Sequence, residues 1–195
     1  RPPPRPAGTP AAWRVRAAAA AAAPGWDTGL TGRRGRTMGE PFELGGNCSW
    51  VAPGVDGDGR AIVLKVAWRH TEALHEAEGL AAVGGDAAAQ VFTFEHDGDA
   101  TVMLLERCDP GVELRGQAEA IQHVVITGLL QAVWSVELPT DHPFRPLSDM
   151  ADDWIERAEP RLESSSLDRG LAREGLAMFR ELARPTPPDV LLFTA

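Results

Sequence analysis

The sequence predicts an α+β protein in which an N-terminal antiparallel sheet contains one helix and a mainly helical region follows. Extended, β-rich runs flank two turn signals, Asp56-Gly57-Asp58-Gly59 and His96-Asp97-Gly98-Asp99, which are typical of β-hairpins. Helical spacing of apolar residues lies between the two hairpins and dominates again after Gly111. The predicted order is therefore hairpin, helix, hairpin and then helices.

The elements follow one another along the chain with clear boundaries. The first hairpin lies in "FELGGNCSWVAPGVDGDGRAIVLKV" and the second in "VFTFEHDGDATVMLLERC". Between them, residues 70–83 carry apolar residues at helical spacing, and Gly84-Gly85 ends that helix. A long helix is expected from six apolar positions on one face: Ile121, Val124, Val125, Leu129, Val133 and Val136. Two further helices, 149–163 and 167–184, and an apolar strand, "DVLLF", complete the prediction.

The pattern divides the chain into three parts. Residues 1–37 are rich in Pro, Ala and Arg and have no periodic apolar face, so we expect a low-complexity segment that is disordered or forms a loose helix. Residues 38–108 form the sheet lobe and residues 109–195 the helical lobe. Trp134 and Trp154 of the helical lobe are expected to pack in its core or between lobes.

Composition excludes several classes of protein. The 195 residues are 44% apolar, which is enough for a core, and the net charge of −9 argues against a nucleic-acid surface and favours cationic small molecules. Two cysteines, Cys48 and Cys108, are too few for a disulfide framework, so a reducing cytoplasm is predicted. The sequence contains no run of eighteen apolar residues, so no membrane span is predicted. The five histidines lack metal-ligand spacing and are expected on the surface.

The single lysine of the chain lies in the strand-like run "AIVLKVAW" as Lys65. A buried ammonium group without a partner costs several kcal/mol, about 3–5 in many proteins, so Lys65 is expected to meet a carboxylate or an anionic ligand. The alternative is an ordinary strand residue whose amine reaches water. Its surroundings decide between the two.

The sequence around Lys65 has the layout of a protein-kinase-like fold. Such a fold has small residues in a turn between the first two strands, a lysine on the third strand, and a helix glutamate that holds the lysine. The turn candidate is Gly45-Gly46-Asn47-Cys48-Ser49, of which Gly45, Gly46 and Ser49 would face phosphates, and the glutamate is Glu76 or Glu78. Taken alone, Gly-Gly-x-x-Ser is more often a turn device than a phosphate site. A lysine on the neighbouring strand strengthens the kinase interpretation.

Three segments, "GEPFELGGNCSWVAPGVDGDGRAIVLKV", "HEAEGLAAVGG" and "VMLLERCDPGVEL", resemble the aminoglycoside phosphotransferases, in particular those acting on streptomycin and hydroxyurea. The resemblance extends over about 26–194. It implies that Lys65 contacts the phosphates of ATP and that Glu76 is its partner, with Glu78 as the alternative. It also makes "LLERCDPG" the hinge, where the Glu106 carbonyl and the Cys108 amide bind adenine and Leu105 lines the pocket.

The resemblance implies transfer of the γ-phosphate of ATP, with Mg²⁺, to a hydroxyl group of an antibiotic or a related small molecule. In the family, a catalytic Asp, an Asn and a metal-binding Asp follow a strand like "DVLLF", so these residues are expected at or beyond Ala195. The chain as given is then expected to lack the catalytic and metal-binding segments, to be inactive and to be marginally stable or to associate. The alternatives are a non-catalytic, pseudokinase-like nucleotide-binding module and a structural domain that only resembles the kinase pattern.

Overall fold

The computed structural model describes residues 36–42, 48–85, 87–162 and 166–184. These residues form two compact units, one up to Thr140 and one from Asp141 onward. The disorder predicted for the N-terminal segment and the strand predicted at "DVLLF" fall almost entirely outside the described residues. The lobe boundary predicted at residue 108 stays a prediction.

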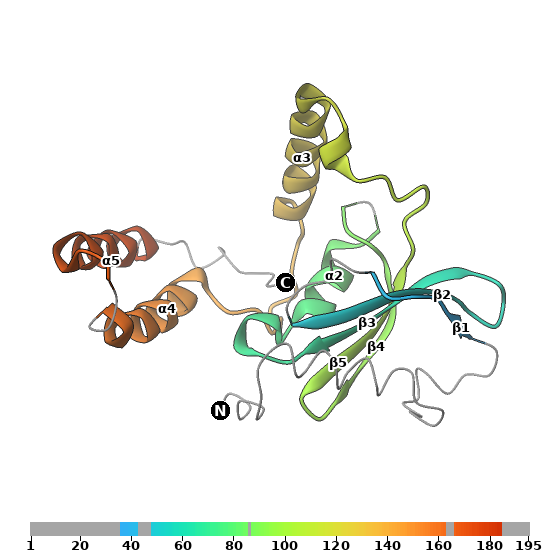
Figure 1. The fold of residues 1–195 in the computed structure, drawn as a ribbon, viewed down its shortest axis with the longest axis horizontal. Coiled ribbons are helices and arrows are strands. Elements are labelled where there is room, and N and C mark those ends of the chain that lie inside the picture. The colour runs from blue at the N-terminus through green and yellow to red at the C-terminus, as the bar shows by residue number, and fades with distance from the viewer. Residues whose placement is uncertain (1–35, 43–47, 86, 163–165, 185–195) are drawn as a thin grey trace. The chain divides into compact units, whose positions relative to one another are not determined.

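The first unit contains a five-stranded antiparallel sheet with the order β1-β2-β3-β5-β4 (Figure 1). Its strands are β1 (Thr37–Met38), β2 (Ser49–Val55), β3 (Ala61–Trp68), β4 (Val91–Asp97) and β5 (Ala100–Glu106). Because β3 lies in the middle, it pairs along its length with β2 on one side and β5 on the other. The predicted α+β class is confirmed, and both predicted hairpins are present.

The first hairpin turn is built by one aspartate. The Asp56 carboxylate accepts hydrogen bonds from the backbone N–H groups of Asp58 at 3.0 Å and Arg60 at 2.8 Å. The Asp56 N–H in turn donates to the Arg60 carbonyl at 2.9 Å. A short polar side chain that bonds its own backbone in this way favours a turn over a continued strand. This local chemistry explains why the turn is visible in the sequence.

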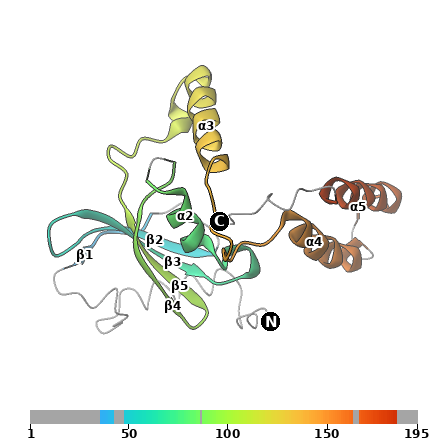
Figure 2. The same ribbon diagram turned by 180° about the vertical axis from the view of Figure 1, so that it is seen from behind.

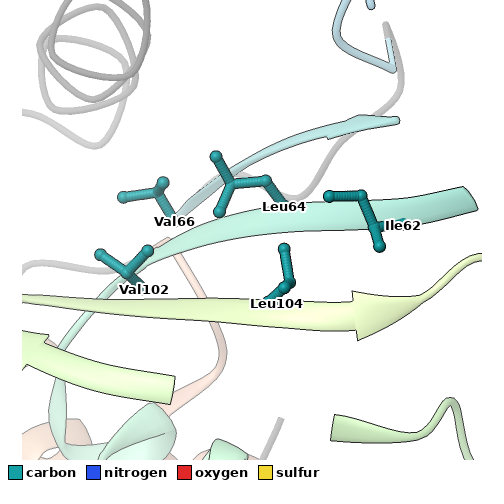
Figure 3. Close-up of a cluster of buried hydrophobic side chains, with 5 residues drawn as sticks. All are labelled: Ile62, Leu64, Val66, Val102 and Leu104. Atoms are coloured by element: carbon teal, nitrogen blue, oxygen red, sulfur yellow. The ribbon is translucent and has the colours of Figure 1, made fainter. Parts of the chain in front are cut away.

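One face of the sheet carries its main apolar cluster. Side chains from the two central strands form it: Ile62, Leu64, Val66, Val102 and Leu104 (Figure 3). All five are at most 5% exposed, and burial of each such side chain contributes about 1.5–3 kcal/mol. Since strand side chains alternate between faces, Val63, Lys65 and Ala67 project from the opposite face.

Helix α2 (Glu76–Val83) covers that opposite face (Figure 2). Ala77 of α2 is buried in a second cluster with Ala67, Met103 and Leu105. The helix predicted over 70–83 is wrong at its start, because a 3₁₀ turn, Thr71–Ala73, comes first and His75 has the non-helical angles φ −122° and ψ 26°. This break sets the rotation of α2 about its axis and decides which glutamate faces the sheet.

Helix α3 (Glu119–Trp134) follows a short 3₁₀ turn, Leu114–Gly116, and confirms the long helix predicted from periodicity. Its predicted apolar face, however, is not buried: Val124 is 75% exposed, and Ile121, Val125 and Leu129 are exposed as well. Trp134 is 76% exposed, so the expectation that it packs in a core is wrong. Periodicity predicts the helix correctly but does not identify a partner for its apolar side.

The second unit is a pair of helices, α4 (Leu147–Leu162) and α5 (Arg169–Ala183). The carboxylate of Asp168 caps α5 by accepting the Leu171 N–H at 2.9 Å. Trp154 of α4 stacks on Phe179 of α5 with ring centroids 6.1 Å apart and planes 13° apart. Trp154 therefore packs between helices of its own unit while 44% of it stays exposed. In the described part of the chain, none of the helices combines the length and the apolar character that crossing a membrane requires.

Candidate nucleotide site

Lys65 lies on the central strand of the sheet and projects from the face that α2 covers. Its Cα partners are Val51 in β2 and Met103 in β5, and residues directly opposite each other in antiparallel strands share a face. Met103 is fully buried beneath this face. The sheet thus fixes where the lysine side chain begins and which way it leaves the backbone.

The Lys65 ammonium group is bonded to the Glu76 carboxylate of α2. The side chain of Glu76 is only 7% exposed, whereas that of Lys65 is 22% exposed. The carboxylate also lies in the first turn of α2, where the helix dipole favours a negative charge. Because an ammonium group has three N–H donors and remains partly accessible, it can hold the carboxylate and bind a second anion. Lys65 is therefore not a strand residue whose amine simply reaches water.

The structure settles which of the two glutamates is the partner of the lysine. Glu78 is two positions from Glu76, about 200° around the helix, so both cannot face Lys65. The Glu78 carboxylate lies instead 3.7 Å from His75 Nδ1 and 3.8 Å from His96 Nε2. On α2, Gly79 is buried and Ala81 is exposed. This burial pattern shows that the side of the helix that carries Glu76 faces the sheet.

The cluster of Glu78, His75 and His96 was not predicted from the sequence. Both histidines are half-buried, which corrects the expectation that all five lie on the surface. Burial, followed by the nearby charge of Arg69, lowers the pKa of His96, and the charge and hydrogen bond of Glu78 oppose this shift. His96 Nδ1 also lies 3.1 Å from the Thr101 hydroxyl. His75 immediately precedes α2 and His96 lies in β4, so only the packing of these two segments brings the histidines together.

The predicted phosphate turn is described only at its end. Gly45 and Gly46 lie outside the described residues, and their role stays a prediction. Ser49 begins β2, is buried and has Ala67 as its Cα partner. Strand alternation places Ser49 and Val51 on the same face as Lys65, with Ser49 two residue pairs further along the β2–β3 ladder. Contact of Ser49 with a phosphate also stays a prediction.

The predicted hinge begins where β5 ends. Leu105 is buried on the face of Lys65, two residue pairs away along the β3–β5 ladder. Glu106 is held by two bonds to Gln90: its N–H donates to the Gln90 carbonyl at 2.8 Å, and its carboxylate accepts the Gln90 N–H at 3.1 Å. Cys108 is exposed, and within the described ranges no backbone acceptor is bonded to its amide. Adenine binding by Glu106 and Cys108 stays a prediction.

A close approach of the backbone follows the hinge. Gly111 has a φ of +63°, and a Cβ atom there would lie 2.8 Å from the Cys108 carbonyl oxygen. Only glycine fits this geometry without strain, because it has no Cβ atom and tolerates positive φ. Gly111 therefore holds the chain close to Cys108 as it leaves β5.

The sheet and α2 bring together four of the eight predicted site residues on one face: Ser49, Lys65, Glu76 and Leu105. Glu106 and Cys108 lie at the end of the strand that carries Leu105. For a metal ion, no group of three or more His, Cys, Asp or Glu side chains is suitably placed in the portions of the chain that the structure describes. The arrangement offers a fixed cation beside buried apolar side chains of the same sheet face.

Comparison with known families shows which protein family the chain belongs to. Residues 34–186, about four fifths of the chain, match the family of aminoglycoside/hydroxyurea antibiotic resistance kinases. The chain belongs to this family. The resemblance drawn from the sequence is thereby confirmed, and the matched range of this resistance kinase includes the whole sheet, α2 and the three later helices. No curated protein was found to match the chain.

Proposed function

We propose that this member of the resistance kinase family binds ATP with Lys65 on the phosphates. We propose further that its reaction transfers the γ-phosphate to a hydroxyl group of an aminoglycoside or a related small molecule. The observation that carries the proposal is the ion pair between Lys65 on the central strand and the buried Glu76 of α2. Kinases require a lysine–glutamate pair of this kind to bind the nucleotide productively.

The ion pair supports phosphate binding through positioning. Glu76 accepts one hydrogen bond of the ammonium group and keeps the side chain extended from β3. The charge of Lys65 is then already oriented before the nucleotide arrives, so less conformational entropy is lost on binding. Within the sheet, Lys65 is also the only charged side chain of β3, so its charge dominates that strand. An anion approaching this face would be attracted to one defined point.

The remaining nucleotide contacts belong to the proposal as well. The backbone of Gly45 and Gly46 and the side chain of Ser49 would contact the phosphates. The Glu106 carbonyl and the Cys108 amide would bind the adenine edge, and Leu105 would contact its ring. Edge recognition by one acceptor and one donor, with an apolar wall, is a common way to fix the orientation of a planar ligand.

Two further components lie outside the described site. Among the described residues, no group of three or more His, Cys, Asp or Glu side chains is placed to hold a metal ion, so no step is assigned through Mg²⁺. The acceptor is proposed to be a cationic, hydroxyl-bearing molecule, which the net charge of −9 would attract. ATP is abundant in the cytoplasm, which is the proposed location.

Titration calorimetry with ATP tests the nucleotide site. We expect Lys65→Met to weaken ATP binding by about tenfold or more, since a charge-assisted contact is lost. The control is Arg115→Met, which removes a cation that is 72% exposed and paired with Glu113. It should change the affinity by less than about twofold. Equal ATP affinity of wild type and Lys65→Met, with both proteins folded by circular dichroism, would overturn the proposal.

A transfer assay tests the reaction separately. The chain would be incubated with ATP and Mg²⁺ and with streptomycin or hydroxyurea, and phosphorylated product would be detected by mass spectrometry. Product with either acceptor would support phosphotransfer. ATP binding without any product would support the nucleotide site alone.

A further inference from the structure

A cleft lies between α4 and α5 within the second unit, remote in sequence from the proposed nucleotide residues. Its volume is about 360 Å³, which is within the range of small-molecule sites. Six residues line it: Glu159, Leu162, Arg169, Arg173, Leu176 and Arg180. None of these residues takes part in the proposed nucleotide site.

The spacing on α5 explains why its arginines converge. Arg169, Arg173, Leu176 and Arg180 are four, three and four residues apart, so they form one stripe along the helix. This stripe faces Glu159 and Leu162 in the last turn of α4. The Arg180 guanidinium donates to the Glu159 carboxylate at 2.9 Å, which joins the two walls of the cleft.

The charge of the cleft is opposite to that of the chain. Among the described residues, its lining has three guanidinium groups and one carboxylate, whereas the whole chain has a net charge of −9. Arg173 makes no ion pair within the ranges that the structure describes. Like charges at i and i+4, as in Arg169 and Arg173, destabilise a helix by a few tenths of a kcal/mol, about 0.2–0.5. An anion in the cleft would remove this repulsion.

We propose that this cleft binds a small organic phosphate, with the phosphate group on Arg173 and Arg169 and the organic group against Leu162 and Leu176. Arg173, which makes no ion pair within the described ranges, supplies positive charge for a phosphate monoester, which carries a charge of about −2 at neutral pH. Guanidinium groups bind phosphate oxygens through two parallel N–H donors, which gives both affinity and orientation. The two leucines favour an ester over inorganic phosphate because they offer apolar contact.

This site is independent of ATP binding at Lys65. It is formed wholly by α4 and α5, whereas the proposed nucleotide residues all precede residue 109. A phosphorylated ligand would therefore be held by the helical unit whether or not the nucleotide site is occupied. Loss of one site by mutation should leave the other unchanged.

Titration calorimetry of the full chain at constant ionic strength, with phenyl phosphate, inorganic phosphate and benzoate as probes, tests the proposal. We expect phenyl phosphate to bind saturably and more tightly than the other two, and Arg173→Ala to weaken it by about tenfold. Arg173→Lys should recover part of the lost phenyl phosphate affinity, because lysine keeps the positive charge but lacks the two parallel N–H donors of the guanidinium group.

Two control variants locate the effect. Arg184→Ala removes an arginine at the end of α5 that lies outside the cleft, 3.9 Å from Asp152, and should change phenyl phosphate affinity by less than about twofold. Lys65→Met should also leave it unchanged, which separates this site from the nucleotide site. No saturable binding up to about 10 mM, equal binding of benzoate, or an equal loss in Arg184→Ala would each overturn the proposal.

Discussion

Glu76 meets Lys65 across the boundary between a helix and a sheet, although only eleven residues separate the two in the chain. The carboxylate comes from the first residue of α2 and the ammonium group from the central strand β3. This ion pair therefore joins α2 to the sheet, which it otherwise contacts through a small apolar cluster of Ala67, Ala77, Met103 and Leu105. Its loss should affect folding as well as nucleotide binding.

Removing either partner of this pair should destabilise the fold more than removing both. We expect Lys65→Met and Glu76→Leu each to lower the free energy of unfolding by about 1–3 kcal/mol, because the remaining charge is left without its partner at a largely buried site. The double variant should regain most of that loss. Urea unfolding followed by circular dichroism gives the three values, and strictly additive losses would contradict a direct interaction.

The lowered pKa of His96 predicts a loss of stability in mild acid. Since the folded protein binds a proton on His96 less readily than the unfolded chain does, protonation favours unfolding. The contribution of His96 should therefore be constant above about pH 6.5 and should become destabilising as the pH falls toward the folded pKa.

Urea unfolding at several pH values between about 7.5 and about 5 measures this effect. We expect His96→Gln to show a shallower fall in stability with acid than the wild type. The control is His123→Gln, since His123 is exposed on α3. Parallel curves for His96→Gln and the wild type would show that burial and Arg69 do not act on His96 as described.

The two tryptophans of the helical part should differ in their effect on stability. Trp154→Ala removes the stacking on Phe179 and should cost about 1–2 kcal/mol in the unfolding of the α4–α5 unit. Trp134→Ala removes a side chain that is mostly in water and should change stability by less than about 0.5 kcal/mol. Calorimetric melting of both variants gives the comparison, and an equal loss in the two would contradict the packing described for Trp154.

Alanine substitutions at Gly111 and Gly98 can be compared to test the predicted hinge. Both have positive φ, so alanine at either costs about 1 kcal/mol through the backbone alone. Only at Gly111 would the added Cβ meet another atom, the Cys108 carbonyl oxygen. We expect Gly111→Ala to be the more destabilising by at least about 1 kcal/mol in urea unfolding. It should also weaken ATP binding, which Gly98→Ala should not; equal behaviour of the two variants would remove the proposed role of the hinge.

Local chemistry explains what the sequence predicts well. Asp56 bonds the backbone of its own turn, and Asp97-Gly98 supplies the positive φ of the second hairpin, so both turns are visible without any tertiary information. Lys65 is conspicuous because a charged residue interrupts an apolar strand. The fold class follows from these signals together with the helical periods, whereas the family is predicted from the resemblance of three segments to known resistance kinases.

Tertiary packing explains what the sequence does not predict. The choice of Glu76 over Glu78 depends on a break at His75 and on the burial of Gly79, neither of which has a pattern in the chain. Strand β1 has only two residues, too few for any periodicity. The arginine-lined cleft requires Glu159 to meet Arg180 from another helix, so only the pairing of α4 with α5 makes it visible.

The central place of β3 in the sheet has a mechanical consequence. A strand with neighbours along both edges is held by two ladders, so the base of the Lys65 side chain is anchored from both sides. Its counter-charge is carried by a short helix attached through residues 69–75. A tilt of that helix would move the Glu76 carboxylate away from the Lys65 ammonium group, whose strand would stay in place. The helix is therefore the movable partner of the pair and the strand the fixed one.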